Sequence, residues 1–359
     1  MKIKILKWWK EIDRVIFILS ILLIAVGIIL SLTGTTEIKG FDSTHFIKRH
    51  LTYSFLSILV IILFSSQDIK TIRRISVIGL FITIIFMFLV IIFGHEINGS
   101  KRWFPIFGFT LQPSEFLKPF FAVISGWFLS KGLEGRNFGF KIIFSLFIIS
   151  SSLLILQPDF GMTFLFFVVF FAQLFVAGLS LVLVFALVLI LLILTISSYL
   201  MIPNVRNRLN MFLDPASHDT YQLDLSLKAF KSGGIFGKGL GQGTLKENIP
   251  DAHTDFIFSI AGEELGFIFC TLLILIFLII VIRSLLSILK KREIYSLIVV
   301  VGLICIFGLQ ALINISSSIG AAPTKGMTLP LISYGGSSML SSSLLIGILL
   351  SHLRYLRYK

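Results

Sequence analysis

The sequence has few charged residues and almost no cysteine. Only 14% of its 359 residues are Asp, Glu, Lys or Arg, whereas 56% are hydrophobic and 37 are Phe. A soluble domain of this size could not bury so much apolar surface, so the composition excludes a soluble globular protein and favours a membrane protein. The two cysteines, Cys270 and Cys305, both lie in apolar runs and are expected to be packing residues rather than a disulfide.

Long polar segments are scarce as well. The sequence shows no internal repeat to argue from, no low-complexity linker and no second soluble domain, so we predict one all-α, polytopic membrane domain over residues 1–359. Residues about 203–254 form the one extended non-membrane segment, a long loop between the seventh and eighth spans. The apolar runs predict about ten transmembrane helices, at 15–33, 50–66, 75–94, 115–131, 142–157, 160–177, 181–202, 256–286, 294–313 and 335–352.

The distribution of Lys and Arg predicts the orientation. The first apolar run follows a basic segment but has no small-residue cleavage site, so we expect a retained span rather than a signal peptide. When successive loops alternate sides, most basic residues fall on the side of the N-terminus. Both termini are therefore predicted to be cytoplasmic and the 203–254 loop periplasmic.

The net charge of +13 largely follows from this orientation and is no evidence for nucleic acid as a partner. The basic residues left on the outer face suit an anionic lipid head group or a phosphate. A general attraction to anionic membrane lipids explains them as well.

Nucleotide and metal motifs are absent from the sequence. The glycine-rich run 233–243 lacks the Walker spacing, so we expect either a hinge or a loop whose amides approach a lipid head group. Residues 221–232 before it are predicted to form an amphipathic, interfacial helix. No cofactor and no metal-ligand cluster is evident, and a divalent cation at a phosphate group stays open.

The stretch 250–259, PDAHTDFIFS, is the central candidate for a functional site. It lies where the polar loop ends and an apolar helix begins. Glu263 and Glu264 lie inside the apolar run of that helix, where ionisable groups need a partner or a wet cavity. Asp255 either caps the helix or takes part in catalysis. At helical spacing, Asp255 shares one face with three small residues, Ser259, Gly262 and Gly266. Such a narrow face suits either a cleft between helices or close helix packing.

Two further outer segments carry candidate side chains. Arg102 and Lys118 could bind a pyrophosphate; alternatively, Ser114 caps the following helix and Glu115 in its first turn pairs with Lys118. Asp159, in the turn between the fifth and sixth spans, is expected to bond the free amides of the next helix.

The segment 323–338 offers Lys325 and Ser333 as donors. It forms either a re-entrant turn that faces a cavity or a purely structural turn.

Taken together, these motifs resemble the SEDS family of shape, elongation, division and sporulation proteins. Their order and spacing match over nearly the whole chain, and the last motif is more similar to division members than to elongation members. The motifs are NGSKRW at 98–103, QPSEFLK at 112–118, QPDFG at 157–161, the glycine run at 233–243, AHTDFIFSIAGEELG at 252–266 and PTKGMTLPLISYGGSS at 323–338.

The resemblance implies a ten-span peptidoglycan glycosyltransferase that polymerises lipid II on the outer face of the bacterial inner membrane, at the division septum. It implies Asp255 as the catalytic residue and places Arg102 and Lys118 on basic positions of the family. It also implies a class B penicillin-binding protein transpeptidase and other divisome membrane proteins as partners. Two positions depart from the pattern: Asp251 stands where Glu is common, and 315–322 is unusually rich in Ser and Ala.

We therefore hypothesise an inverting glycosyl transfer in which Asp255 is the general base and undecaprenyl pyrophosphate leaves. A lipid II flippase, an elongation-type polymerase and a scaffold for the transpeptidase are the alternatives. The predicted substrate-binding residues are Arg102, Lys118, Glu115, Lys325, Ser333, Glu263 and Glu264.

Overall fold

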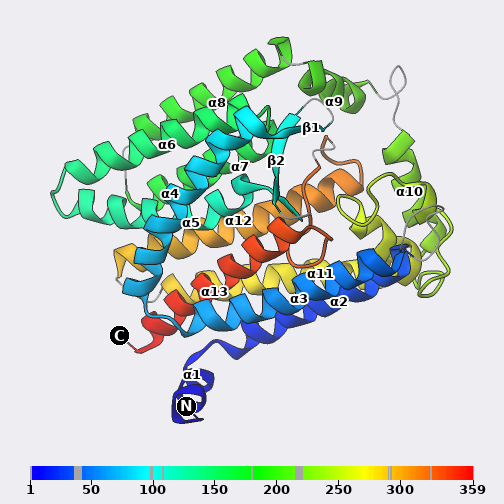
Figure 1. Cartoon of the computed structure of the whole chain (residues 1–359), viewed down its shortest axis with the longest axis horizontal. Helices are drawn as coiled ribbons and strands as arrows, with labels where there is room; N and C mark the ends of the chain where they lie inside the picture. The colour runs from blue at the N-terminus through cyan, green and yellow to red at the C-terminus, as the bar shows by residue number, and fades with distance from the viewer. Residues whose placement is uncertain are drawn as a thin grey trace.

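The computed structural model describes residues 2–35, 43–97, 100–106, 109–178, 181–201, 203–214, 221–289, 291, 293–323 and 326–358. These residues form a bundle of long helices, as the apolar runs predicted (Figure 1). Within them, seven helices are long and apolar enough to cross a membrane, or eight if one bent pair counts as a single span. The all-α, polytopic membrane fold is therefore confirmed.

Every predicted span overlaps one helix. The helices before the sheet are α1 (Lys2–Glu11), α2 (Arg14–Thr35), α3 (Ser43–Ser66) and α4 (Ile69–Phe93). The central helices are α5 (Pro113–Leu133), α6 (Phe138–Leu156), α7 (Phe160–Val176) and α8 (Leu181–Met201). The segment between the seventh and eighth predicted spans contains α9 (Pro203–Leu213), α10 (Tyr221–Gly233) and the short 3-10 helix η2 (Lys246–Asn248). The last helices are α11 (Ile257–Leu289), α12 (Ile294–Ser318) and α13 (Gly336–Tyr358).

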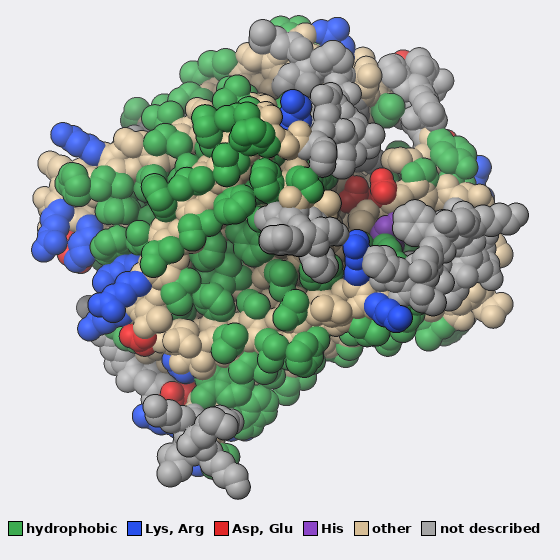
Figure 2. All heavy atoms as spheres, viewed as in Figure 1, with side chains coloured by type: hydrophobic (Ala, Val, Ile, Leu, Met, Phe, Trp, Pro, Cys, Tyr) green, Lys and Arg blue, Asp and Glu red, His purple; other side chains and the backbone are tan. Residues whose placement is uncertain are grey.

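The bundle has two distinct ends. Both termini lie at one end, and α10 with the loop that follows it lies at the other (Figure 1). The surface between these ends is broadly hydrophobic, and Lys and Arg side chains gather at the end that carries the termini (Figure 2). Near the opposite end, acidic and histidine side chains come together in a hollow of the same face (Figure 2).

A small antiparallel sheet replaces the loop predicted at 95–114. It consists of β1 (His95–Ile97), β2 (Ser100–Ile106) and β3 (Phe109–Leu111), in the order β1-β2-β3. Aromatic and β-branched residues in β2 and β3 favour extended backbone. The sequence reasoning missed these strands because they are short and because a Pro interrupts β2.

A buried amide connects three helices in the interior. The Nε2 of Gln173 on α7 donates to the carbonyl of Ala122 on α5 (2.9 Å) and to that of Ile298 on α12 (3.1 Å). Its Oε1 accepts a hydrogen bond from Ser125 of α5 at 2.5 Å. Because hydrocarbon offers no water, a buried amide must find its partners in the protein. Gln173 therefore holds α5, α7 and α12 together.

We expect Gln173→Met to lower the free energy of unfolding by about 1 kcal/mol, because the three helices lose their shared hydrogen-bonding partner. Thermal unfolding in detergent is the measurement. Gln222→Met, at an exposed position of α10, is the matched control. Equal melting temperatures for the two variants would contradict this role for Gln173.

Candidate functional site

Asp255 is half-buried in the chain of turns that leads into α11. Its amide donates to the carbonyl of Asp251 at 3.0 Å, and the Thr254 hydroxyl donates to the same carbonyl at 3.0 Å. Asp251 takes up a left-handed backbone conformation with a φ of 54°. The local chain therefore folds tightly just before the helix, and Thr254 uses its hydroxyl within the turn.

Asn314 on α12 holds the backbone of Asp255 from the side. Its Nδ2 donates to the carbonyl of Asp255 at 2.8 Å and to the carbonyl of Met327 at 2.6 Å. Gly326, next to Met327, lies so close that a Cβ there would be 3.0 Å from the Asp255 Oδ2. Asn314 therefore joins the segment after α12 to the segment that carries Asp255.

Ser333 and Tyr334 form a second attachment between these segments. The Ser333 hydroxyl donates to the carbonyl of Thr254 at 2.6 Å and accepts from the amide of Leu329 at 2.8 Å. The Tyr334 amide donates to the carbonyl of His253 at 3.0 Å. Ser333 thus lies next to the segment that carries Asp255, and its hydroxyl, predicted as a donor to substrate, is bonded to backbone groups.

The turn between α12 and α13 is packed inside the bundle. Met327, Leu329, Leu331 and Ile332 are all buried. The Ile332 carbonyl lies against Gly27 of α2, where a Cβ would be only 2.5 Å away. The segment 326–338 is therefore a tightly packed turn, and the bonds of Ser333 to backbone groups favour the structural alternative for this part of 323–338. Lys325 lies outside the described residues.

Lys118 and Glu115 form a buried ion pair at the start of α5. The Lys118 Nζ is 2.8 Å from the Glu115 Oε2 and 2.8 Å from the Gln310 Oε1. The Gln310 amide donates in turn to the carbonyl of Thr328 at 3.2 Å. Gln310 and Asn314 lie one turn apart on α12, so this helix connects the ion pair to the segment that contacts Asp255.

The start of α5 corrects one prediction. The helix begins at Pro113 with Gln112 at its N-cap, so the proposed cap at Ser114 is wrong. Proline is favoured in the first turn because its missing N–H needs no partner there. Glu115 lies in the first turn and pairs with Lys118, as predicted.

Arg102 contacts the QPDFG turn. One guanidinium nitrogen is 2.5 Å from the carbonyl of Pro158, and another is 3.4 Å from the Asp159 Oδ1. Asp159 also accepts from the amide of Met162 at 3.3 Å and so caps α7, as predicted. Within the described part of the chain, no hydrogen bond links Arg102 to the cluster around Asp255.

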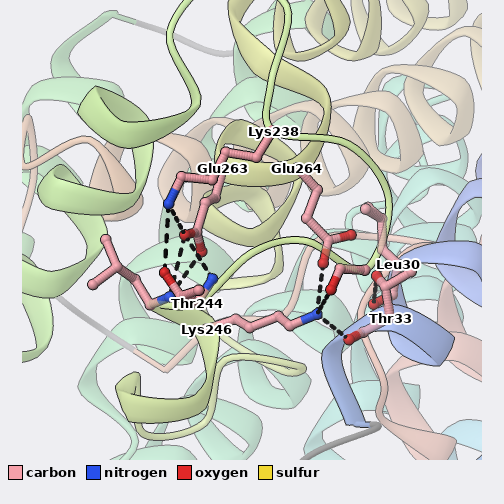
Figure 3. A network of polar contacts seen from close by, with 9 residues as sticks. Leu30, Thr33, Lys238, Thr244, Lys246, Glu263 and Glu264 are labelled. Carbon is pink, nitrogen blue, oxygen red and sulfur yellow. Dashed lines mark hydrogen bonds and ion pairs between the residues drawn. The ribbon is translucent and has the colours of Figure 1, made fainter.

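Glu263 and Glu264 face the loop 233–246 and are fully buried. Glu263 pairs with Lys238 at 3.1 Å and Glu264 with Lys246 at 2.8 Å (Figure 3). The sequence predicted that these buried glutamates need a partner or a wet cavity. Their partners are Lys238 and Lys246 of the loop 233–246. Neither glutamate is hydrogen-bonded to the segment that carries Asp255, as far as the described residues show.

The small-residue face of α11 is covered by α10. The hydroxyls of Ser226 and Ser259 are 2.6 Å apart, and Gly262 lies against the ring of Phe230. Close helix packing is therefore observed at Ser259 and Gly262 instead of an open cleft. The predicted helix at 221–232 is present, and its buried face packs on α11.

Comparison with known proteins identifies the family. The model of a family of cell cycle proteins, which takes its name from FtsW, RodA and SpoVE, matches residues 13–358. The chain belongs to the FtsW/RodA/SpoVE family. It is 37% identical over 352 residues to a Caulobacter vibrioides protein named "Probable peptidoglycan glycosyltransferase FtsW", covering 97% of this chain and 90% of the relative.

Solved structures of this family share the fold. A chain from a peptidoglycan synthase complex that coordinates polymerization and crosslinking aligns with a TM-score of 0.73 at 27% identity, over 93% of this chain and 96% of that one. The rod shape determining protein RodA of Thermus thermophilus aligns with a TM-score of 0.69 at 24% identity, over 97% and 98% of the two chains. The resemblance drawn from the six motifs is therefore confirmed.

Asn314 and Gln310 are the site residues that sequence reasoning missed in this FtsW/RodA/SpoVE family member. Both are buried amides in a helix that is apolar over most of its length. Their spacing of one helical turn was the signal that could have revealed them, because two amides on one face of a membrane helix indicate a polar contact surface.

An aromatic cluster lies next to this site. Phe46 stacks on Tyr334 with ring centroids 3.9 Å apart, and His253 meets Phe46 edge-on at 4.6 Å. Burial lowers the pKa of His253 below its usual 6.5, and the nearby Asp251 carboxylate opposes this only in part. Burial also raises the pKa of Tyr334. Both rings are therefore neutral at pH 7.

Within the described part of the chain, no group of three or more His, Cys, Asp or Glu could hold a metal ion.

Asn314→Leu should lower the free energy of unfolding by about 1–3 kcal/mol, because two buried carbonyls lose their donor. Chemical or thermal unfolding in detergent measures this loss. Asn137→Leu, at an exposed helix start whose side chain makes no cap hydrogen bond, is the control. An effect of Asn314→Leu no larger than that of the control would be evidence against the attachment.

The His253 shift predicts a pH dependence of stability. The unfolded chain binds a proton near pH 6.5 while the folded chain resists protonation, so stability is complete above that pH and falls as the pH drops below it. We expect the melting temperature between pH 7.5 and 5.5 to fall more steeply for the wild type than for His253→Gln. Parallel curves would show that His253 is not the group responsible.

Proposed function

We propose that this chain is a peptidoglycan glycosyltransferase that polymerises lipid II into glycan strands, with Asp255 as its general base. The observation that carries the proposal is the placement of Asp255, half-buried and with its backbone held by Asn314. The relative that is 37% identical across nearly the whole chain and is named a peptidoglycan glycosyltransferase supports the activity.

In the proposed reaction, the Asp255 carboxylate accepts the proton of the acceptor sugar's 4-hydroxyl. The hydroxyl oxygen attacks the anomeric carbon of the donor as the bond from that carbon to the pyrophosphate oxygen breaks. Undecaprenyl pyrophosphate leaves with the electron pair, and the configuration at the anomeric carbon inverts. One carboxylate is enough because a pyrophosphate leaving group needs less acid assistance than a sugar alcohol.

Negative charge develops on the pyrophosphate, so cationic groups must lie near it. We assign this role to Lys118 and Arg102, with Lys325 as a third candidate. Because the Lys118 side chain is only 2% exposed, we assign it electrostatic stabilisation at a distance and not direct contact with the pyrophosphate. Glu115 and Gln310 fix the ammonium of Lys118 in advance, which favours a preorganised site. Arg102 is fixed in the same way by the turn at Pro158.

The remaining predicted ligands have a different role in the proposal. Ser333 supports the backbone next to Asp255, since its hydroxyl is bonded to the Thr254 carbonyl. Glu263 and Glu264 are paired with lysines away from the reacting groups. We assign no cofactor; addition of a chelator to the assay tests whether a divalent cation is needed at the pyrophosphate.

In the proposed topology, ten helices cross the bacterial inner membrane, with both termini in the cytoplasm and the 203–254 segment in the periplasm. The termini lie at the end of the bundle opposite α10, which supports this orientation (Figure 1). The similarity to FtsW supports a place at the division septum. The solved relative from a peptidoglycan synthase complex supports a class B penicillin-binding protein as partner, alongside other divisome membrane proteins.

A lipid II flippase would use buried charges along a path across the membrane. Lys118, Glu263 and Glu264 are the buried charges that suggested such a path, and each of them is in an ion pair. The pairs of Glu263 and Glu264 fix carboxylates that the polymerase does not need and that a translocation path would use, so these two contacts favour the polymerase.

Asp255→Asn should reduce the formation of glycan polymer from labelled lipid II by on the order of 100-fold or more, because the reaction loses its base. The assay compares the purified variants in detergent, with and without the candidate transpeptidase. Asp68→Asn, at an exposed helix start, is the control and should polymerise like the wild type.

Equal polymer from Asp255→Asn and wild type would remove Asp255 from the chemistry. Wild type that makes no polymer even with the partner, but moves lipid II across vesicle membranes, would favour the flippase.

A further inference from the structure

The helix that follows Asp255 is broken. Gly266 of α11 has a φ of 77° and a ψ of −177°, so the short half 257–265 is separated from the rest of the helix. The loop 233–246 supplies hydrogen bonds to the backbone groups that the break leaves free. These bonds join Lys238 N to Glu263 O (3.0 Å), Gly239 N to Glu264 O (2.9 Å) and Phe267 N to Gly234 O (3.0 Å).

The glycines of the loop permit this close contact. Gly237 has a φ of 81° and lies against the backbone of Glu264, where a Cβ would collide with the carbonyl. At Gly243 a Cβ would be 2.9 Å from the Glu263 Oε2. Close approach to α11 therefore explains Gly237 and Gly243, without a bound nucleotide or head group.

Two acidic side chains then fix the loop, in an arrangement that we call the glutamate clamp: Glu263 with Lys238, and Glu264 with Lys246 (Figure 3). The Glu263 carboxylate also accepts from the amides of Thr244 (2.9 Å) and Leu245 (3.2 Å). The Lys246 ammonium also donates to the carbonyl of Thr33 at the end of α2 (2.6 Å). The clamp therefore connects α11, the loop and α2.

Burial makes both glutamates unavailable to a substrate. Each is 0% exposed, and the Lys246 side chain is 2% exposed. A buried carboxylate that lost its lysine would leave an uncompensated charge in a low-dielectric interior. Direct binding of a pyrophosphate or a sugar would require the clamp to open.

The clamp fixes the chain on both sides of Asp255. Lys246 and η2 precede the 251–256 turns, and the half-helix 257–265 that carries both glutamates follows them. In addition, Asn314 and Ser333 hold the backbone carbonyls of Asp255 and Thr254. The segment that carries Asp255 is thus held both directly and through the chain on either side of it.

We infer that Glu263 and Glu264 are positioning residues for Asp255, acting through the glutamate clamp, and not ligands of the lipid-linked substrate. The inference rests on the proposed role of Asp255 as general base. A displacement of the base by about 1 Å lowers the rate of the chemical step more than it weakens binding.

Glu264→Gln should lower kcat for lipid II polymerisation by on the order of 10- to 100-fold, with the KM for lipid II within about twofold of wild type. The variant leaves the Lys246 ammonium buried without its counter-charge, which displaces the loop. The double variant Lys246→Met/Glu264→Gln removes both charges at similar volume and should recover most of the lost kcat. Glu134→Gln, which breaks an exposed ion pair with Lys131, is the matched control and should match wild type.

Amide hydrogen exchange of peptides covering 244–256, measured without substrate, gives a readout that needs no activity. Exchange should be faster in Glu264→Gln by on the order of tenfold and near wild type in the double variant. If Glu264→Gln fails to fold, Glu263→Gln is the milder test, because its partner Lys238 is 32% exposed and can turn to water.

A raised KM with unchanged kcat and unchanged exchange would overturn the inference and make the glutamates ligands. Unchanged exchange in both single variants would overturn it as well. If wild type makes no polymer, the proposed function fails by itself, and the exchange data still decide whether the clamp holds the segment around Asp255.

Discussion

The side-chain amide of Asn314 makes the contact on which the proposed site depends. With two hydrogen bonds it fixes the carbonyls of Asp255 and Met327, two segments that are far apart in the sequence. Gln310, one turn away, extends the same helix face to Thr328 and to the Lys118–Glu115 pair. The segment of the proposed base and one of its proposed cations are therefore both in contact with a single helix, α12. A rigid helix holds such groups more precisely than a loop does.

The low dielectric of the bundle explains why buried charges occur in pairs. Gln173 satisfies its amide on α5 and α12, and each of the buried carboxylates Glu115, Glu263 and Glu264 is paired with a lysine. Unpaired charges would be costly at this depth, so the pairs that serve the proposed chemistry also stabilise the fold. The Lys118 pair lies in the network that leads to Asp255, whereas the glutamate clamp holds the loop before it. In the proposed mechanism, the Lys118 pair is thus near the reacting groups, and the glutamate clamp supports the base from outside.

Sequence reasoning succeeded at most positions where the physical signal was local. Apolar runs predicted the helices, the three-residue spacing predicted the pair of Glu115 and Lys118, and the turn chemistry predicted the cap at Asp159. It was wrong at Ser114, because Pro113 moved the start of the helix. It missed the sheet at 95–111 because the strands are short and a Pro interrupts β2. It missed the docking of the glycine run on α11 because that contact joins segments that are distant in the sequence. The requirement that Glu263 and Glu264 find partners was predictable, but the identity of Lys238 and Lys246 was not.

The most direct test of the account is a structure of the chain with a non-reactive acceptor analogue of lipid II bound. The account predicts that an Asp255 carboxylate oxygen lies roughly 2.6–3.2 Å from the acceptor's 4-hydroxyl, with the Asn314 contacts intact. An acceptor hydroxyl placed well beyond hydrogen-bonding distance of Asp255, with another ionisable group next to it, would contradict the assignment of the base.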